Sequence, residues 1–262
     1  MTLESLLAPG VLGKALFEVN LLLLFGVCFL HSWRAHGGAR TLREFSAGFA
    51  LTALAESTGV LSGAYVYPGF RFYIFATPVG NPASWVALVY VIMKVSERIV
   101  FGRRALVESA PLLGSSVVKT LLALALFDAM GALLLDLVLD PMATIYNWWI
   151  WVPFREGLHT VPVGEVDPYN FERLIWMATP ENPVADFFGR FFEGGYRYPT
   201  RLLGIPLINF IAWAVFVFVL SFEFRWVERQ QAWSEWRRTA TLLGFVGLDW
   251  PILSFLLIAP NI

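Results

Sequence analysis

The sequence predicts an all-α protein that crosses a membrane several times, and three observations support this. Of the 262 residues, 57% are hydrophobic and only 15% are charged, whereas a soluble globular domain is usually about a quarter charged. The mean hydropathy is +0.63. Apolar runs recur along the chain that are long enough to cross a bilayer as helices, which takes roughly 20 residues. These runs are too long and unbroken to be the strands of a barrel.

We expect a polytopic transmembrane bundle of about six spanning helices in a single membrane domain, residues 1–262. The six apolar runs are Val11–His31, Ser46–Val66, Pro82–Phe101, Val117–Leu139, Pro206–Phe224 and Ala240–Ala259. The connection 140–205 is rich in Pro, Gly and aromatic residues, which favours short helices lying at the membrane interface. No repeat with a fixed period stands out.

The distribution of arginine predicts the orientation. The connections after the first, third and fifth runs carry most of the arginines, including Arg34, Arg40, Arg43, Arg98 and Arg225. Lys and Arg in short connections are retained on the cytoplasmic side. We therefore expect both termini to lie outside.

Several function classes are excluded by what the chain lacks. Three histidines are too few for an oxygen-activating di-iron centre, and the last apolar run has no lysine for a retinal Schiff base. No GxSxG, P-loop or HExxH motif is present, and no basic tract or nucleic-acid-binding motif. The single cysteine, Cys28, rules out an intramolecular disulfide framework. We expect no metal site, no organic cofactor and no nucleic-acid partner.

The residues that could do chemistry are carboxylates in apolar surroundings, namely Glu56 in the second run and Asp128, Asp136 and Asp140 in or just after the fourth. An acidic side chain at the bilayer centre costs about 2.5–3.5 kcal/mol on insertion scales. It therefore normally faces the interior of the bundle, pairs with another polar group, or has a function. Burial and a second carboxyl nearby both disfavour the charged form of a carboxyl group. Such a group can stay protonated near neutral pH and act as a general acid.

Helical spacing groups the aspartates. Asp136 and Asp140 are four residues apart and share a helix face. Asp128 precedes Asp136 by eight residues, which places it roughly 80° away around the helix axis. Asp140 precedes Pro141, which predicts that the helix ends there. The alternatives are a terminating or interface role for Asp140 and a hydrogen bond to a neighbouring helix for Asp128.

In the second run, Glu56, Gly59 and Gly63 share one face. The glycines would let the fourth helix approach closely, or would serve helix packing alone. Tyr65 and Tyr67, like the tryptophans 148, 149 and 151, fall near the outer interface. Such residues are explained by an aromatic belt at the membrane interface. The alternative explanation is that some of them line a pocket in which they stabilise a developing cation.

Four segments in the same order then carry a resemblance. They are Glu56-x-x-Gly59 followed by Gly63-x-Tyr65-x-Tyr67; Asp136-x-x-x-Asp140-Pro141; Trp149-x-Trp151; and Gly204-Ile205-Pro206-Leu207-x-Asn209-Phe210-x-x-Trp213. Over about residues 30–225 the chain resembles the family of carotenoid biosynthesis membrane proteins that includes the CruF-type carotenoid 1′,2′-hydratases. The chain departs from the family pattern by an inserted interfacial segment at about residues 152–198.

The resemblance implies a cofactor-independent hydro-lyase in a bacterial or archaeal cytoplasmic membrane. It would add water to the terminal double bond of an acyclic carotenoid end group by acid-catalysed protonation. Either Glu56 or Asp136 would donate the proton, and Asp140 or the other carboxylate would hold the water. The implied substrate-binding residues are Gly59, Gly63, Tyr65, Tyr67, Trp149, Trp151, Asn209 and Trp213.

Two other functions stay open. The protein could be a non-catalytic subunit that binds a carotenoid or another isoprenoid lipid and docks on a membrane-protein partner through the 152–198 segment. A weaker alternative is a small ion-coupled transporter, because intramembrane acids and Gly/Pro interruptions also mark such sites. A catalytic role predicts that Glu56, Asp136 and Asp140 converge on one apolar tunnel open to lipid, whereas structural roles would leave them separately paired.

Overall fold

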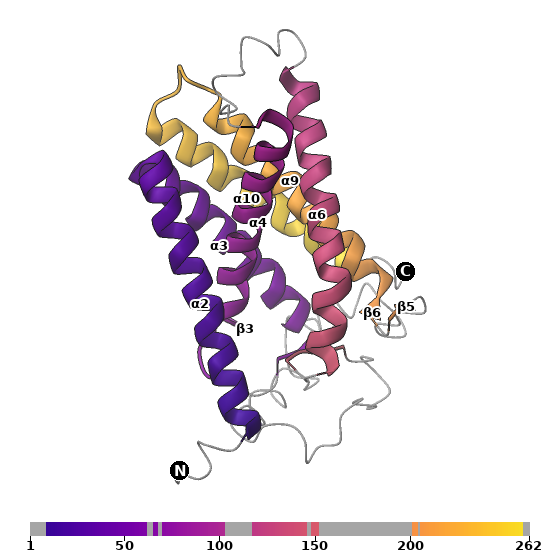
Figure 1. Ribbon diagram of the computed structural model, residues 1–262. Coiled ribbons are helices and arrows are strands. Elements are labelled where there is room, and N and C mark those ends of the chain that lie inside the picture. The colour runs from indigo at the N-terminus through magenta and orange to yellow at the C-terminus, as the bar shows by residue number, and fades with distance from the viewer. Residues whose placement is uncertain are drawn as a thin grey trace.

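The computed structural model is an all-α bundle with a few short strand pairs at one end (Figure 1). It describes residues 9–61, 65–67, 70–102, 117–145, 148–151, 201–203 and 205–258. The helices in these ranges are α2 (Pro9–His36), α3 (Gly38–Leu61), α4 (Gly80–Phe101), α6 (Val117–Ile145), α9 (Leu207–Glu228) and α10 (Glu235–Ile258). Helices that follow one another run in opposite directions. The α2–α3 turn, the end of α4 and the α9–α10 turn therefore lie at the same end of the bundle (Figure 1).

The prediction of six spanning helices is corrected by the structure. Of the six described helices, three contain segments long and apolar enough to cross a membrane, Leu12–His36, Val117–Ala143 and Leu207–Glu228. The apolar stretches of α3, α4 and α10 are interrupted by polar and charged residues. Most of these residues are buried in α3, and in α4 the polar residues Asn81, Ser84 and Ser96 are buried. A helix that is surrounded by other helices can carry polar residues, because it does not need an apolar surface toward lipid. The overall hydrophobicity of the three sequence runs therefore did not distinguish these helices from membrane-spanning ones.

Two of the differences between the predicted and the observed helix boundaries concern residues that were given a role from the sequence. Gly37 alone makes the turn between α2 and α3, with φ at +84°, and its N–H donates to the Trp33 carbonyl (3.0 Å). Glycine adopts this left-handed conformation without steric cost. Arg34 and Arg40, expected in a loop, therefore lie in helices. The second difference is that α6 continues through Pro141 to Ile145 instead of ending at Asp140, because tertiary contacts with α9 override the local preference of a proline.

A buried ion cluster joins α4, α6 and α9. Arg225, which was expected in a cytoplasmic loop, lies inside α9 and is 1% exposed. Its guanidinium donates to the carboxylates of Asp128 and Glu97, the latter at 3.1 Å. It also donates to Ser96 Oγ (3.1 Å) and to the Met93 carbonyl (3.3 Å). Asp128 thus has the structural role that was considered for it, a bond to a neighbouring helix.

Short antiparallel strand pairs, which the sequence did not predict, close the other end of the bundle. β1 (Tyr65–Val66) follows α3 and pairs with β4 (Ile150–Trp151), which follows α6. Two hairpins precede α4 and α9: β2 (Tyr73–Ile74) with β3 (Thr77–Pro78), and β5 (Arg201–Leu202) with β6 (Ile205–Pro206). The β1–β4 pair holds the ends of α3 and α6 together. The predicted interfacial segment 152–198 and Gly63 lie outside the described residues.

Candidate functional site

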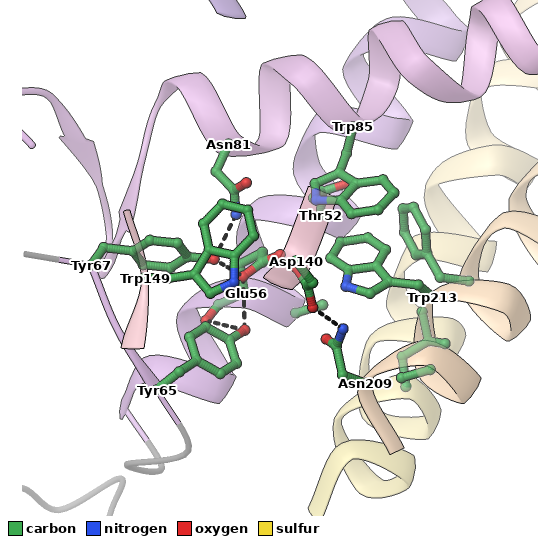
Figure 2. Close-up of a pocket in the computed structure, with 14 residues that line it drawn as sticks. Thr52, Glu56, Tyr65, Tyr67, Asn81, Trp85, Asp140, Trp149, Asn209 and Trp213 are labelled. Atoms are coloured by element: carbon green, nitrogen blue, oxygen red, sulfur yellow. Dashed lines mark hydrogen bonds between the residues drawn. The ribbon is translucent and has the colours of Figure 1, made fainter. Parts of the chain in front are cut away.

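A pocket lies among the ends of α3, α4, α6 and α9 (Figure 2). These helix ends are at the opposite end of the bundle from the α2–α3 and α9–α10 turns (Figure 1). It measures about 60 Å³, which is room for several waters at roughly 10–15 Å³ each, or for the tip of a slim apolar chain. Seven residues proposed from the sequence line it: Glu56, Tyr65, Tyr67, Asp140, Trp149, Asn209 and Trp213. Side chains from distant parts of the sequence thus line one pocket.

Glu56 projects from α3 into the pocket and is 4% exposed. The hydroxyls of Tyr65 and Tyr67 both donate to its Oε2, at 2.7 and 2.5 Å. Asn81, on the first turn of α4, donates from Nδ2 to the Tyr67 hydroxyl at 2.7 Å. Figure 2 shows this chain of hydrogen bonds ending at Glu56. The carboxyl group is therefore held by one of its two oxygens.

The two tyrosines that reach Glu56 lie at the start of β1 and directly after its last residue, Val66. In extended backbone, side chains two residues apart point to the same side, and the hydroxyls of Tyr65 and Tyr67 both bond to Glu56. Gly59 makes room for the first of them, because a Cβ atom at Gly59 would lie 2.3 Å from the Tyr65 hydroxyl oxygen. We expected this glycine to admit the fourth helix, and the structure places Tyr65 there instead.

Replacing Gly59 with alanine should therefore displace Tyr65 from Glu56. Alanine gains about 0.5–1 kcal/mol over glycine inside a helix, but overpacking a tight contact costs about 1–3 kcal/mol, so the variant should be less stable. We expect a lower unfolding midpoint in detergent, measured by circular dichroism. Gly244→Ala on α10 is the control, since nothing lies within 4 Å of its added Cβ. A Gly59→Ala protein as stable as Gly244→Ala would contradict the close packing.

Asn209 joins the two aspartates of α6. Its Nδ2 donates to Asp136 Oδ2 at 3.1 Å and also to Asp140 Oδ2. The four-residue spacing puts both carboxylates on the face of α6 that packs against α9. Asp140 lines the pocket, whereas Asp136 is fully buried behind it and its Oδ1 has no hydrogen-bond partner among the described residues.

These carboxylates are close enough to influence one another, since Asp140 lies within electrostatic reach of both Asp136 and Glu56. The hydrogen bonds that the structure describes for the three come from hydroxyl, amide and indole groups, not from arginine or lysine. Buried Asp128, by contrast, is neutralised by Arg225. Ionising three neighbouring carboxyls without a counter-ion is costly. The cluster is therefore suited to holding and exchanging protons.

Aromatic side chains form the apolar part of the pocket (Figure 2). Trp85 of α4 stacks on Trp213 of α9, with ring centroids 3.4 Å apart and planes at 11°. Phe216 meets Trp213 edge-on, at 5.2 Å and 87°. On the other side Tyr67 meets Trp149 at 6.0 Å and 71°. The faces of such rings carry partial negative charge, which stabilises a cation nearby.

The remaining proposed residues do not all line the pocket. Gly59 packs behind Tyr65, and Trp151 contributes backbone to β4 while its side chain is outside the described residues. The sequence analysis missed seven lining residues: Thr52, Ala55, Asn81, Trp85, Ala212, Phe216 and Leu253. Asn81 and Trp85 could have been found, because Asn-x-x-x-Trp occurs at the start of two apolar runs. In the ranges described above, no group of three or more His, Cys, Asp or Glu side chains is arranged to hold a metal ion.

Comparison with known proteins gives one match. The sequence pattern of a family described as carotenoid biosynthesis protein matches residues 12–164, more than half of the chain. No curated protein and no solved structure matches. The matched region includes Glu56, Asp136, Asp140 and Trp149, and Asn209 follows it. The chain therefore belongs to the carotenoid biosynthesis protein family.

Proposed function

We propose that the protein adds water across the terminal double bond of an acyclic carotenoid end group. Family membership suggests an enzyme that acts on a carotenoid. The observation that carries the reaction class is that Glu56 and Asp140 share one pocket with aromatic walls. Hydration of an alkene needs a proton donor, a positioned water and a dry surface that tolerates a cation. The pocket has groups suited to each.

Glu56 is the proton donor in this proposal. Tyr65 and Tyr67 both donate to Oε2, so the acidic proton resides on Oε1. Transfer of that proton to the less substituted alkene carbon uses the π electrons to form a C–H bond. A tertiary carbocation remains at the neighbouring carbon, beside the stacked pair of Trp85 and Trp213. Because the inner faces of the pair cover each other, an outward face of the pair would stabilise the cation.

Asp140 holds the attacking water. The water oxygen bonds to the cation and its proton passes to Asp140, which gives a neutral tertiary alcohol. Asn209 fixes the orientation of Asp140 and ties it to Asp136. The proton must return to Glu56 before the next turnover, so the reaction consumes only the alkene and one water.

Arginines near the α2–α3 turn, among them Arg34, Arg40 and Arg43, favour a cytoplasmic position for the end of the bundle opposite the pocket. The pocket, the start of α2 and the end of α10 would then lie in the outer half of the membrane. A long polyene would remain in lipid while its end group enters the pocket.

Expression in lycopene-producing cells tests the reaction. The wild-type protein should convert lycopene to a product heavier by one water or two, detected by liquid chromatography with mass spectrometry. Cells carrying the empty vector are the control. If membranes contain the protein and several acyclic carotenoids stay unchanged, the hydratase proposal is wrong, and a carotenoid-binding role becomes the better explanation of the pocket.

A further inference from the structure

The two β-hairpins are the first sign that part of the chain is duplicated. The β2–β3 hairpin pairs Tyr73 with Pro78 and Ile74 with Thr77. The β5–β6 hairpin has the same register, with the pairs Arg201–Pro206 and Leu202–Ile205. Among the described residues other than glycine, two have a positive φ: Phe75 in the first hairpin and Leu203 at the matching place in the second, both at 53°. Side chains rarely adopt this conformation, so its recurrence at equivalent positions indicates the same local structure twice.

The helices before and after the hairpins repeat as well. Glu56 stands five residues before the last residue of α3 and nine before Tyr65. Asp140 stands five residues before the last residue of α6 and nine before Trp149. On the same alignment Thr52, which lines the pocket, corresponds to Asp136.

After each hairpin the sequence reads Pro-x-x-Asn-x-x-x-Trp. In the first copy this is Pro78, Asn81 and Trp85, and in the second it is Pro206, Asn209 and Trp213. The unit α3–β1–β2–β3–α4 therefore recurs as α6–β4–β5–β6–α9. The additional length of the second copy falls between β4 and β5.

The two copies meet about an approximate two-fold axis at the pocket. In the β1–β4 pair, Val66 lies opposite its own counterpart, Ile150. The stack of Trp85 on Trp213 likewise joins two equivalent residues. The contacts between copies are reciprocal, since α3 packs on α9 and α4 packs on α6. Equivalent groups thus face one another from both sides of a single hollow.

We infer that the pocket is one ligand site built from two half-sites, in which Asn81 and Trp85 are the functional counterparts of Asn209 and Trp213. Asn209 donates directly to Asp140. Asn81 acts on Glu56 through the Tyr67 hydroxyl. Asn81 is a positioning residue, and Trp85 and Trp213 together are the surface on which the end group of an acyclic isoprenoid chain lies. The roles of the two acids rest on the proposed hydration.

The half-sites differ in a way that suits two different tasks. The first copy has tyrosines where the second has tryptophans at 149 and 151. A phenol both donates and accepts hydrogen bonds, whereas an indole only donates. Tyr67 can therefore link Asn81 to Glu56. The duplicated frame thus presents one acid that is held by two hydroxyls and one that is held by an amide and an indole.

Binding of lycopene to purified protein in lipid nanodiscs tests the shared surface. The readout is the circular dichroism induced in the visible absorption band of the polyene. Trp85→Ala and Trp213→Ala should each weaken binding by about tenfold, the usual worth of an aromatic contact. Trp233→Ala, at the far α9–α10 turn, should bind as the wild type does. If Trp85→Ala does not fold, Trp85→Leu fills the same apolar space without a π-face. Wild-type affinity in either folded Trp85 variant overturns the inference.

Steady-state hydration tests the positioning role of Asn81. Asn81→Leu should lower kcat by about ten- to a hundredfold with little change in KM, because one hydrogen bond behind the acid is lost. Asn81→Gln, which keeps the donor, should recover part of the rate, and Asn20→Leu on the exposed side of α2 should change nothing. An unchanged kcat in Asn81→Leu overturns the assignment. If the wild type binds lycopene without hydrating it, the proposed function is wrong, and the tryptophan variants alone decide the two-half-site inference.

Discussion

Glu56→Gln is expected to lower the rate of hydration by about 10²–10⁴-fold, the usual contribution of a general acid. Glutamine has nearly the same size, and its carbonyl oxygen can still accept the bonds from Tyr65 and Tyr67 that Oε2 accepts now. The variant should therefore fold, but it has no acidic proton to give. Initial rates of hydration by purified protein in nanodiscs, with product measured by mass spectrometry, would show the loss.

Glu223→Gln provides the matched control. Glu223 is a buried carboxylate on α9 that does not line the pocket, so the same chemical change there should leave the rate close to that of the wild type. Equal losses of rate in both variants would mean that replacing any buried carboxylate disturbs the bundle as a whole. A normal rate in Glu56→Gln would assign the proton to another group, and Asp140 would be the first to examine.

The sequence was a good guide to the helices and a poorer guide to which of them face lipid. Apolar runs predicted all six described helices, because burial in protein and burial in lipid both select apolar residues. The same ambiguity produced six predicted spans where three helices qualify. The extent of α3 was missed for a related reason. Its first turns carry Arg40 and Arg43, which resemble loop residues until their partners Glu44 and Glu228 are known.

The sequence analysis identified the site residues whose type is energetically costly in an apolar run, and it overlooked those whose type is common there. A carboxylate in an apolar run calls for an explanation, so Glu56, Asp136 and Asp140 were recognised at once. Asn81 and Trp85 lie near the start of a helix, where polar and aromatic residues are common. The repeat that contains them was hidden because the two copies share few identical residues and the second is longer. Paired strands and matching backbone angles expose it, and neither can be read from composition.

Arg225→Met should cost about 3–5 kcal/mol in the free energy of unfolding, the usual penalty for removing one partner of a buried ion pair. Asp128 would remain 0% exposed with its charge unmatched, and its Oδ1 already has no hydrogen-bond partner among the described residues. Methionine fills a similar volume, so the loss reflects charge more than a cavity. Unfolding by sodium dodecyl sulfate in mixed micelles, followed by far-UV circular dichroism, measures the change.

The double variant Arg225→Met with Asp128→Leu separates charge from packing. Replacing a whole buried ion pair with apolar residues is often neutral or stabilising by about 1–4 kcal/mol, so the second substitution should restore most of the loss. Glu97 would still have a counter-ion in the double variant, because Lys94 Nζ lies 2.9 Å from its Oε2. Arg98→Met, an exposed arginine on α4, should stay within about 0.5 kcal/mol of the wild type. If the double variant is as unstable as the single one, Arg225 stabilises the bundle through its bonds to Ser96 and the Met93 carbonyl instead.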